Sequence, residues 1–373
     1  MNKKYRGSFD RHLGLLFAAV LAVFLIINII LPDKAMSFTE NRPLAQFPRV
    51  SPASLSLGTY ADDFETYLSD QFAGRDGWRN AISFIRWVGG NRKEQGVYSA
   101  PGGQLLAELI APAEGVMEAN TAFINSAAAK SSGGNVLVCL VPDAGAVMPN
   151  RYPPFSVNAD QAALFAQVKD GLDEGVIWID AASAMKDSGV KKLYYKTDHH
   201  WTTAGAKAVY EAFCGMLQTE PASFTAYTVS RTFNGSLSAL SGFCMLERET
   251  IEIYVPEEEE SVVLTYTDEQ KKKATLYDRS KLDTSDQYAV FLGGNSSVID
   301  ISTTAKSDRS ILVVKDSFAN CFIPFLTQHY SRIIVVDPRY YYGDVNGIFT
   351  KYAADDVLFL YSGNTFFEAR IAD

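Results

Sequence analysis

Two of the four histidines in this 373-residue chain stand next to each other, in the segment Asp198-His199-His200-Trp201. If the segment is extended, side chains two positions apart share a face, so that Asp198 lies beside His200 while His199 points away. A carboxylate beside an imidazole fixes the ring tautomer and stabilises the imidazolium ion, which suits the ring to general-base catalysis. The spacing therefore predicts His200 as a general base that Asp198 orients.

Two other interpretations of this segment remain open from the sequence alone. A helical pattern begins directly after it, so Asp198 or Thr202 could cap a helix while the histidines pack in the interior. Asp198 and the two histidines also offer three metal ligands, but no further cluster of cysteine or histidine accompanies them. We therefore expect no metal and no other cofactor.

A candidate nucleophile follows a predicted strand. Residues 311–314 are Ile-Leu-Val-Val, and the chain continues directly into Lys315, Asp316 and Ser317. Open α/β sheets bind ligands beyond the carboxyl ends of their strands, which is where Ser317 would stand. A serine hydroxyl attacks poorly until a base removes its proton, and we assign His200 as that base. A serine in such a place is more often a turn or cap residue. The assignment therefore depends on the combination of Ser317 with the predicted Asp198–His200 pair.

Two asparagines are candidates for stabilising an oxyanion. The predicted strand at 357–361 leads into Ser362, Gly363 and Asn364, again at a carboxyl edge. The Asn364 amide and the backbone N–H of Ser317 could donate to the oxyanion of a tetrahedral intermediate. A Gly-Asn turn is an equally simple explanation. Asn295, after two glycines, is a second candidate of the same type.

The elements that would position these residues alternate between short apolar runs and helical patterns. The apolar runs are four to six residues long and lie at 136–141, 176–179, 311–314, 333–336 and 357–361. Such runs, rich in β-branched and aromatic residues, are typical of strands buried on both faces. They predict an α/β fold with a doubly wound parallel sheet. Residues 220–290 interrupt the rhythm as a β-rich insertion, in which 250–255 and 262–267 are predicted to form an antiparallel hairpin.

The amino end of the chain predicts a membrane anchor. Residues 13–31 contain one polar side chain, Asn28, and as a helix they reach about 28 Å, roughly the bilayer core. The basic residues before them predict a cytoplasmic amino end. We favour an uncleaved anchor over a signal peptide, since the apolar run is long and the nearby small-x-small site at 35–37 is poor. The predicted parts are a cytoplasmic tail at 1–11, the anchor at 12–31, a linker with two amphipathic helices at 32–95, and an extracytoplasmic domain at 96–373.

Composition excludes some classes of protein. The 34 basic and 43 acidic side chains give a net charge of −9, and no basic stripe is present, so we expect no nucleic-acid partner. The four cysteines lack the C-x-x-C spacing of metal or redox sites. Cys214 and Cys244 could pair, or all four cysteines could be small buried side chains.

The Asp198-His199-His200-Trp201 segment resembles the signature of the DHHW family, which is similar to the SGNH hydrolase-like proteins of alginate O-acetylation. Further segments that resemble the family are Phe38-Thr39-Glu40-Asn41-Arg42, Lys315-Asp316-Ser317-Phe318 and Val336-Asp337-Pro338-Arg339-Tyr340. The resemblance implies a flavodoxin-like, SGNH-hydrolase-like sheet. It also implies a Ser-His-Asp triad, which falls on the three residues reached above.

The resemblance further implies transfer of an acetyl group to, or its removal from, a surface polysaccharide. A membrane-bound O-acyltransferase that supplies the acetyl group is the implied partner. We therefore expect an O-acetyltransferase with an acetyl-Ser317 intermediate. A carbohydrate acetylesterase, or a non-catalytic glycan-binding or assembly protein, remains the alternative. Lys315 stands where SGNH proteins usually have glycine, and Asn364 lacks their Gly-x-Asn-Asp context, so the sequence supports these two substrate-binding candidates less well than the triad.

Further residues are expected to contact the substrate. Arg339 follows the next strand and is suited to orient a carboxylate or an acyl group. The aromatic residues that could stack on a sugar ring are Tyr194, Tyr195, Trp201, Tyr340 and Tyr341. Packing in the protein interior is the alternative for the aromatic residues.

Overall fold

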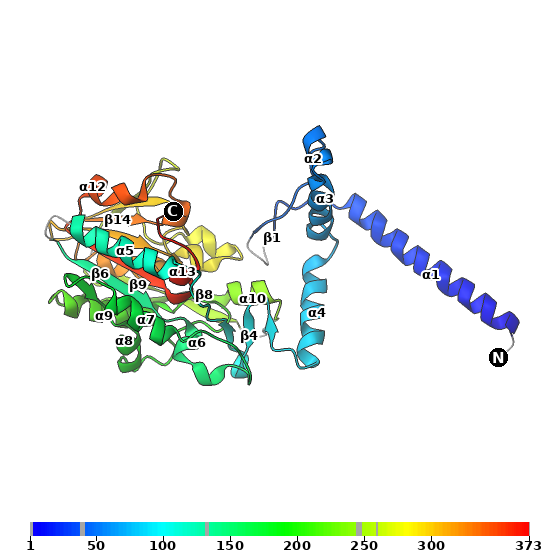
Figure 1. Cartoon of the computed structure of the whole chain (residues 1–373), viewed down its shortest axis with the longest axis horizontal. Coiled ribbons are helices and arrows are strands. Elements are labelled where there is room, and N and C mark those ends of the chain that lie inside the picture. Colours follow the sequence, from blue (N-terminus) through cyan, green and yellow to red (C-terminus); the bar gives the residue numbers. More distant parts are fainter. Residues whose placement is uncertain (1–2, 38–41, 131–133, 244–247, 259, 373) are drawn as a thin grey trace. The chain divides into compact units, whose positions relative to one another are not determined.

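A computed structural model describes residues 3–37, 42–130, 134–243, 248–258 and 260–372 of the chain. It divides into two compact units, Met1–Gly90 and Asn91–Asp373, called here the N-terminal and C-terminal units (Figure 1). Residues 38–41, part of the segment at 38–42 that resembles the DHHW family, lie outside the described residues. Cys244, one of the two cysteines that could pair, lies outside them as well, and Cys214 is a buried free cysteine.

The N-terminal unit begins with a long helix. The helices of this unit are α1 (Lys3–Ile30), α2 (Pro52–Ser56), α3 (Thr59–Asp70) and α4 (Arg75–Val88), and its two-residue strands are β1 (Met36–Ser37) and β2 (Arg42–Pro43). Residues Asp10–Ile30 of α1 are long and apolar enough to cross a membrane. The two amphipathic helices expected in the linker are therefore present as α3 and α4.

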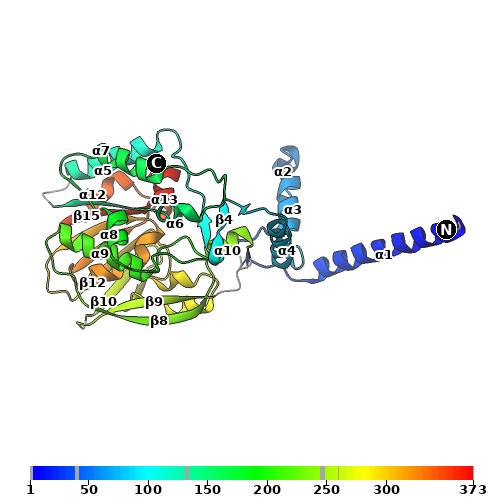
Figure 2. The same ribbon diagram turned by 90° about the horizontal axis from the view of Figure 1, so that it is seen from below.

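An eight-stranded sheet forms the centre of the C-terminal unit (Figure 2). Its strand order is β11-β10-β12-β14-β13-β15-β6-β7. Its strands are β6 (Val136–Val141), β7 (Val176–Trp178), β10 (Val262–Tyr266), β11 (Lys271–Lys273), β12 (Val298–Thr303), β13 (Ser310–Lys315), β14 (Arg332–Val336) and β15 (Asp356–Ser362). The five strands from β14 to β7 are parallel. They are the five apolar runs of the sequence. The other three strands are antiparallel and extend the sheet at one side.

Helices cover both faces of this sheet. The side chains of β13 alternate, so that Ile311 and Val313 join one apolar cluster while Leu312 and Val314 join another. The first cluster includes residues of α8 (Ala181–Asp187) and α9 (Thr203–Met216). The second includes residues of α5 (Val116–Lys130), α7 (Gln161–Asp170), α12 (Ile348–Tyr352) and α13 (Gly363–Glu368). This arrangement confirms the predicted α/β class, with a mixed rather than wholly parallel sheet.

The strands between residues 220 and 290 differ from the prediction. The segment at 250–255 does not form a hairpin with 262–267. It lies in β9 (Glu249–Pro256), which pairs with β8 (Phe224–Phe233) in a separate two-stranded sheet. The second segment forms β10 and joins the central sheet, because its buried Leu264 and Tyr266 align with Ile301 and Ile299 of β12. Apolar cross-strand pairs in register outweigh closeness along the chain here.

Short elements complete the C-terminal unit. The remaining strands are β3 (Lys93–Glu94), β4 (Val97–Ser99) and β5 (Leu105–Ala107), and the remaining α-helices are α6 (Ala144–Val147), α10 (Ser236–Ser241) and α11 (Ile323–Leu326). The 3-10 helices are η1 (Pro101–Gly103), η2 (Pro149–Arg151), η3 (Arg279–Asp283), η4 (Gln287–Val290), η5 (Ser317–Cys321), η6 (Pro338–Tyr340) and η7 (Val345–Gly347). Two of these elements, η4 and η5, carry residues of the candidate site.

Candidate active site

The structure brings Asp198, His200 and Ser317 together. His200 Nδ1 lies 2.6 Å from Asp198 Oδ1, and His200 Nε2 lies 2.9 Å from Ser317 Oγ. Because the carboxylate oxygen can only accept, Nδ1 carries the proton and Nε2 accepts from the serine hydroxyl. This is the relay that a serine nucleophile with a histidine base requires.

The loop that carries the histidines is folded rather than extended. Tyr194 and Trp201 form a bridge between its two ends, and the backbone between them bends continuously. Asp198 Oδ1 accepts a hydrogen bond from the backbone N–H of His200 at 2.9 Å, which closes the turn. His199 therefore does not point away, and its ring centroid lies 3.8 Å from that of His200. The prediction of the Asp198–His200 pair is thus right, although the extended backbone assumed for it is wrong.

Two neighbouring segments hold this loop in place. The buried Glu249 carboxylate accepts from the backbone N–H groups of Lys196 and Thr197, at 2.8 Å in each case. The backbone N–H of Ser236 donates to Asp198 Oδ2 at 2.7 Å. A Cβ on Gly235 would lie 2.2 Å from Asp198 Cβ, so the close approach of these backbones requires glycine at that position.

Asp198 is ionised within this setting. Burial raises the pKa of its carboxyl, but the adjacent imidazoles of His200 and His199 lower it more, so the pKa lies well below its ordinary value. The ionised carboxylate accepts hydrogen bonds on both oxygens. It can therefore stabilise positive charge as it develops on the His200 ring.

His200 is a neutral base in this structure. Burial, followed by the nearby His199, lowers the pKa of its imidazole to about 4, although Asp198 opposes the shift. The ring of Tyr288, in η4, stacks on it with centroids 3.7 Å apart and an interplanar angle of 10°. Tyr288 thereby restricts rotation of the imidazole, and nothing in the sequence around it signals this role.

We expect the pH dependence of the reaction to report this shift. A base whose pKa is depressed is neutral above that pKa, so activity should be retained at mildly acidic pH and fall as the pH drops through about 4. The measurement is kcat/KM for 4-nitrophenyl acetate hydrolysis across the acidic range. An acid limb centred near the ordinary imidazole pKa of 6.5 would contradict the assignment.

Ser317 is the first residue of η5, and Asp316 alone separates it from the end of β13. The Asp316 carboxylate accepts from the backbone N–H of Phe318 and from that of Ser362, each at 2.9 Å. It thus caps η5 and joins the ends of the neighbouring strands β13 and β15. The backbone N–H of Ser317 donates to no acceptor among the described residues, so it remains available to an oxyanion.

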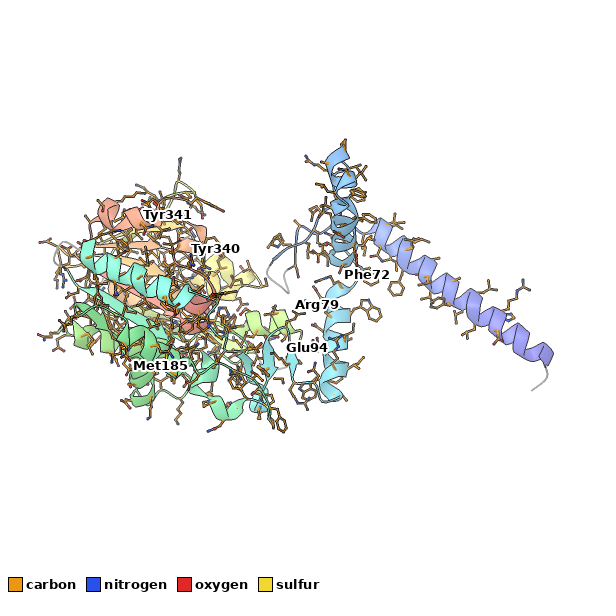
Figure 3. The ribbon with its side chains drawn as sticks, viewed as in Figure 1. Phe72, Arg79, Glu94, Met185, Tyr340 and Tyr341 are labelled. Carbon is orange, nitrogen blue, oxygen red and sulfur yellow. The ribbon has the colours of Figure 1, made fainter. Side chains whose placement is uncertain are left out.

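Trp201 connects the two halves of the relay. Its indole N–H donates to the backbone carbonyl of Phe318 at 2.8 Å, and its side chain is 0% exposed. The expectation that Trp201 stacks on a sugar is therefore wrong, because no face of the ring reaches the surface. The same correction applies to the buried Tyr194 and Tyr195. Tyr340 is 46% exposed and lies at the surface of the C-terminal unit, with Tyr341 beside it in the sequence (Figure 3).

Lys315 and Asn364 are both engaged inside the protein. The Lys315 ammonium is buried, and it donates to Asn295 at 3.0 Å, Asn320 at 2.9 Å and Asp337 at 3.2 Å. All three of its protons are thus occupied, which corrects the prediction that Lys315 contacts substrate. The Asn364 side-chain amide donates to the backbone carbonyl of Glu108 and accepts from the backbone N–H of Ile110. Asn364 therefore holds the segment 108–110 in place instead of facing an oxyanion.

Arg339 completes the charged cluster beside β13. It holds Asp337 through Nε and Nη2, at 2.9 and 2.7 Å, while about a third of its side chain stays exposed. Burial lowers the pKa of Lys315, with the Asp337 carboxylate opposing the shift. Burial raises the pKa of Asp337, but Lys315 and Arg339 lower it more. The cluster therefore contains a buried ion pair, and Arg339 is its partly exposed member.

Asp198, His199 and His200 also meet the geometric condition for a metal site, with ligand atoms within 4.8 Å of one another. Both ring nitrogens of His200 already face protein partners, the Asp198 carboxylate and the Ser317 hydroxyl. This arrangement favours proton transfer over metal coordination, and we retain the prediction that the site uses no metal.

The fold and the arrangement of its site define an α/β protein in which a serine, a histidine and an aspartate form a hydrogen-bonded relay. A family model described as "DHHW protein" matches residues 128–336, more than half of the chain. The chain therefore belongs to the DHHW family, as the signature segment predicted.

Solved structures support the same fold. A DHHW family protein from Eubacterium siraeum DSM 15702 is similar at 23% identity with a TM-score of 0.63, over 74% of this chain and 93% of that chain. Bacillus cereus PatB1 is similar at 21% identity with a TM-score of 0.61, over 73% of this chain and 97% of that chain. A structure of Bacillus cereus PatB1 with a sulfonyl adduct is similar at 20% identity with a TM-score of 0.60, over 73% of this chain and 95% of that chain. No curated protein matches the chain. At these identities the likeness concerns the fold.

Proposed function

We propose that this chain is an O-acetyltransferase that acts on a cell-surface or exported polysaccharide through an acetyl-Ser317 intermediate. The single observation that carries this proposal is the hydrogen-bonded relay from Asp198 through His200 to Ser317. Membership of the DHHW family and the resemblance of that family to proteins of alginate O-acetylation support the choice of reaction.

The first half-reaction transfers the acetyl group to the protein. Ser317 Oγ attacks the carbonyl carbon of an acetyl ester while His200 Nε2 takes the hydroxyl proton. The backbone N–H of Ser317 donates to the oxyanion, and Asp198 stabilises the imidazolium ion. The ester C–O bond then breaks, and the leaving oxygen takes the proton from His200.

The second half-reaction repeats these steps with a sugar hydroxyl as the nucleophile. His200 removes the proton of that hydroxyl, and the new ester bond forms as the bond to Ser317 Oγ breaks. The proton returns to Ser317, which restores the starting state. The exposed Tyr340 and the partly exposed Arg339 are the predicted residues that remain suited to contact the glycan.

The place of the protein in the cell is part of the proposal. With α1 as a single-pass anchor and the amino end in the cytoplasm, the C-terminal unit faces outward, where surface polysaccharides are found. A membrane-bound O-acyltransferase that delivers acetyl groups across the bilayer is the proposed partner.

Acetyl partitioning tests the proposal. The purified full chain is given 4-nitrophenyl acetate with or without added cellopentaose or an oligouronate, and acetylated sugar is measured by mass spectrometry together with free acetate. Transfer predicts that an oligosaccharide diverts acetyl groups into an ester product. Release of acetate alone, at a rate that no oligosaccharide changes, would instead identify an esterase. Absence of both products would support a non-catalytic protein.

A further inference from the structure

Helix α4 in the N-terminal unit exposes its apolar side. Trp78, Ile82 and Ile85 lie on one side of the helix at a spacing of three to four residues, and they are 51%, 49% and 68% exposed. Ser83, on a different side of the helix, is buried. The helix thus buries a polar residue, while the described residues leave its large apolar side chains about half exposed or more.

Contacts with α1 place the start of α4 near the end of the anchor. The ring of Phe24 lies 6.2 Å from that of Trp78 and 6.1 Å from that of Phe72 (Figure 3 labels Phe72). Asn28 Oδ1 accepts from the backbone N–H of Ala73 at 2.8 Å. Phe24 and Asn28 both belong to the candidate membrane span Asp10–Ile30. If α1 spans a bilayer, these contacts hold the beginning of α4 at the depth of the last two turns of the span.

The residue types of α4 fit the boundary between lipid and water. Tryptophan concentrates at this boundary because its ring is apolar and its N–H polar. Arg86 is exposed on one flank of the apolar side. On the same flank, Arg75 is held by Asp70 and Asp76, at 3.7 Å in each case, and Arg79 Nη1 is buried. Cationic side chains beside an apolar stripe attract phosphate headgroups while the stripe enters the acyl region.

We propose that α4 lies in the plane of the membrane surface, in the leaflet that holds the C-terminal end of α1. Trp78, Ile82 and Ile85 enter the boundary between headgroups and acyl chains, and the Arg86 guanidinium meets the phosphates. The helix is about 21 Å long, which gives the chain a second, parallel attachment beside the anchor. This inference depends on the proposed membrane anchoring by α1.

A depth measurement tests the inference on the full-length chain. The protein carries Cys244→Ser and is reconstituted in vesicles of phosphatidylcholine and phosphatidylglycerol. Single cysteines are introduced by Ile85→Cys, or by Asn80→Cys on another side of the same helix, and are labelled with an environment-sensitive fluorophore. The described native cysteines are buried. We expect a nitroxide near the top of the lipid acyl chain to quench the label at position 85 about twofold or more, and to leave the label at 80 nearly unchanged.

A third label separates failure of this inference from failure of the anchor. Phe17→Cys places the same fluorophore in the middle of α1, where a nitroxide near the end of the acyl chain should quench it. Quenching at 17 without quenching at 85 would overturn the proposal for α4 while leaving the anchor intact. A label at 85 that is shielded from water but not quenched would reveal a protein cover, which overturns it as well. Absence of quenching at 17 would refute the anchor itself.

A charge variant keeps the test independent of the labelling chemistry. Ile82→Glu places a carboxylate in the proposed apolar boundary, so the label at position 85 should lose about half or more of its quenching. Circular dichroism of the same protein checks that helix content is retained. Unchanged quenching in this variant, with helix content retained, would contradict insertion of the apolar side.

Discussion

Replacement of Ser317 by alanine is expected to lower kcat for acetyl transfer and ester hydrolysis by a factor of about 10³ or more. The variant removes the atom on which the acetyl intermediate forms, while the side chain it shortens is only partly buried. Both products of 4-nitrophenyl acetate should therefore disappear together, with the fold retained. Steady-state rates and circular dichroism measure the two effects.

Ser302→Ala is the matched control for this variant. Ser302 is an exposed serine in β12, away from the relay, and its replacement should leave the rates unchanged. A sulfonyl fluoride should label the wild-type protein and the Ser302 variant at Ser317, as judged by mass spectrometry of peptides. More than a tenth of wild-type activity in the Ser317→Ala protein would remove the serine mechanism.

Replacement of Asp198 by asparagine is expected to lower kcat by a factor of about 10³ to 10⁴, which is the scale for loss of the orienting carboxylate in serine triads. Asp198 Oδ1 accepts from the His200 ring, and Oδ2 accepts from the N–H of Ser236. An amide NH₂ in place of either oxygen would meet a donor. If it faces the ring, it forces the tautomer that carries the proton on Nε2, which cannot receive the proton of Ser317.

Asp187→Asn serves as the control for this change, since Asp187 is exposed at the end of α8. The effect of Asp198→Asn should appear in kcat, with little change in KM, because the carboxylate acts on the developing imidazolium ion. NMR of the imidazole nitrogens should show the proton moved from Nδ1 to Nε2. A variant that keeps its rate, or that changes KM alone, would argue that Asp198 only supports the loop.

The sequence was sufficient for the parallel strands and for the relay. Continuous apolar runs such as 136–141 and 311–314 have few alternatives to strands buried on both faces, and both became central strands. The pairing of Asp198 with His200 depended on residue chemistry at short range. Ser317 was found because its place after a central strand is set by the same local pattern.

Long-range contacts explain what the sequence did not reveal. The bend at 196–200 depends on the Glu249 carboxylate, which lies 53 residues from Lys196 along the chain. The burial of Lys315 depends on Asn295 and Asp337, which are 20 and 22 residues away. Tyr288 stacks on His200 from a 3-10 helix with no motif of its own. Residue spacing cannot encode such partners, because the tertiary fold brings them together.

The lysine-rich strand β11 has a consequence for solubility. It is an edge strand of the eight-stranded sheet and consists of Lys271, Lys272 and Lys273. The outer side of an edge strand carries unpaired N–H and carbonyl groups, to which a strand of another molecule can add. The exposed ammonium groups of Lys271 and Lys272 repel such an addition between copies of this protein, whereas that of Lys273 is paired with Asp278. The opposite edge strand, β7, is only three residues long. Neither edge of the sheet therefore offers a long template for aggregation.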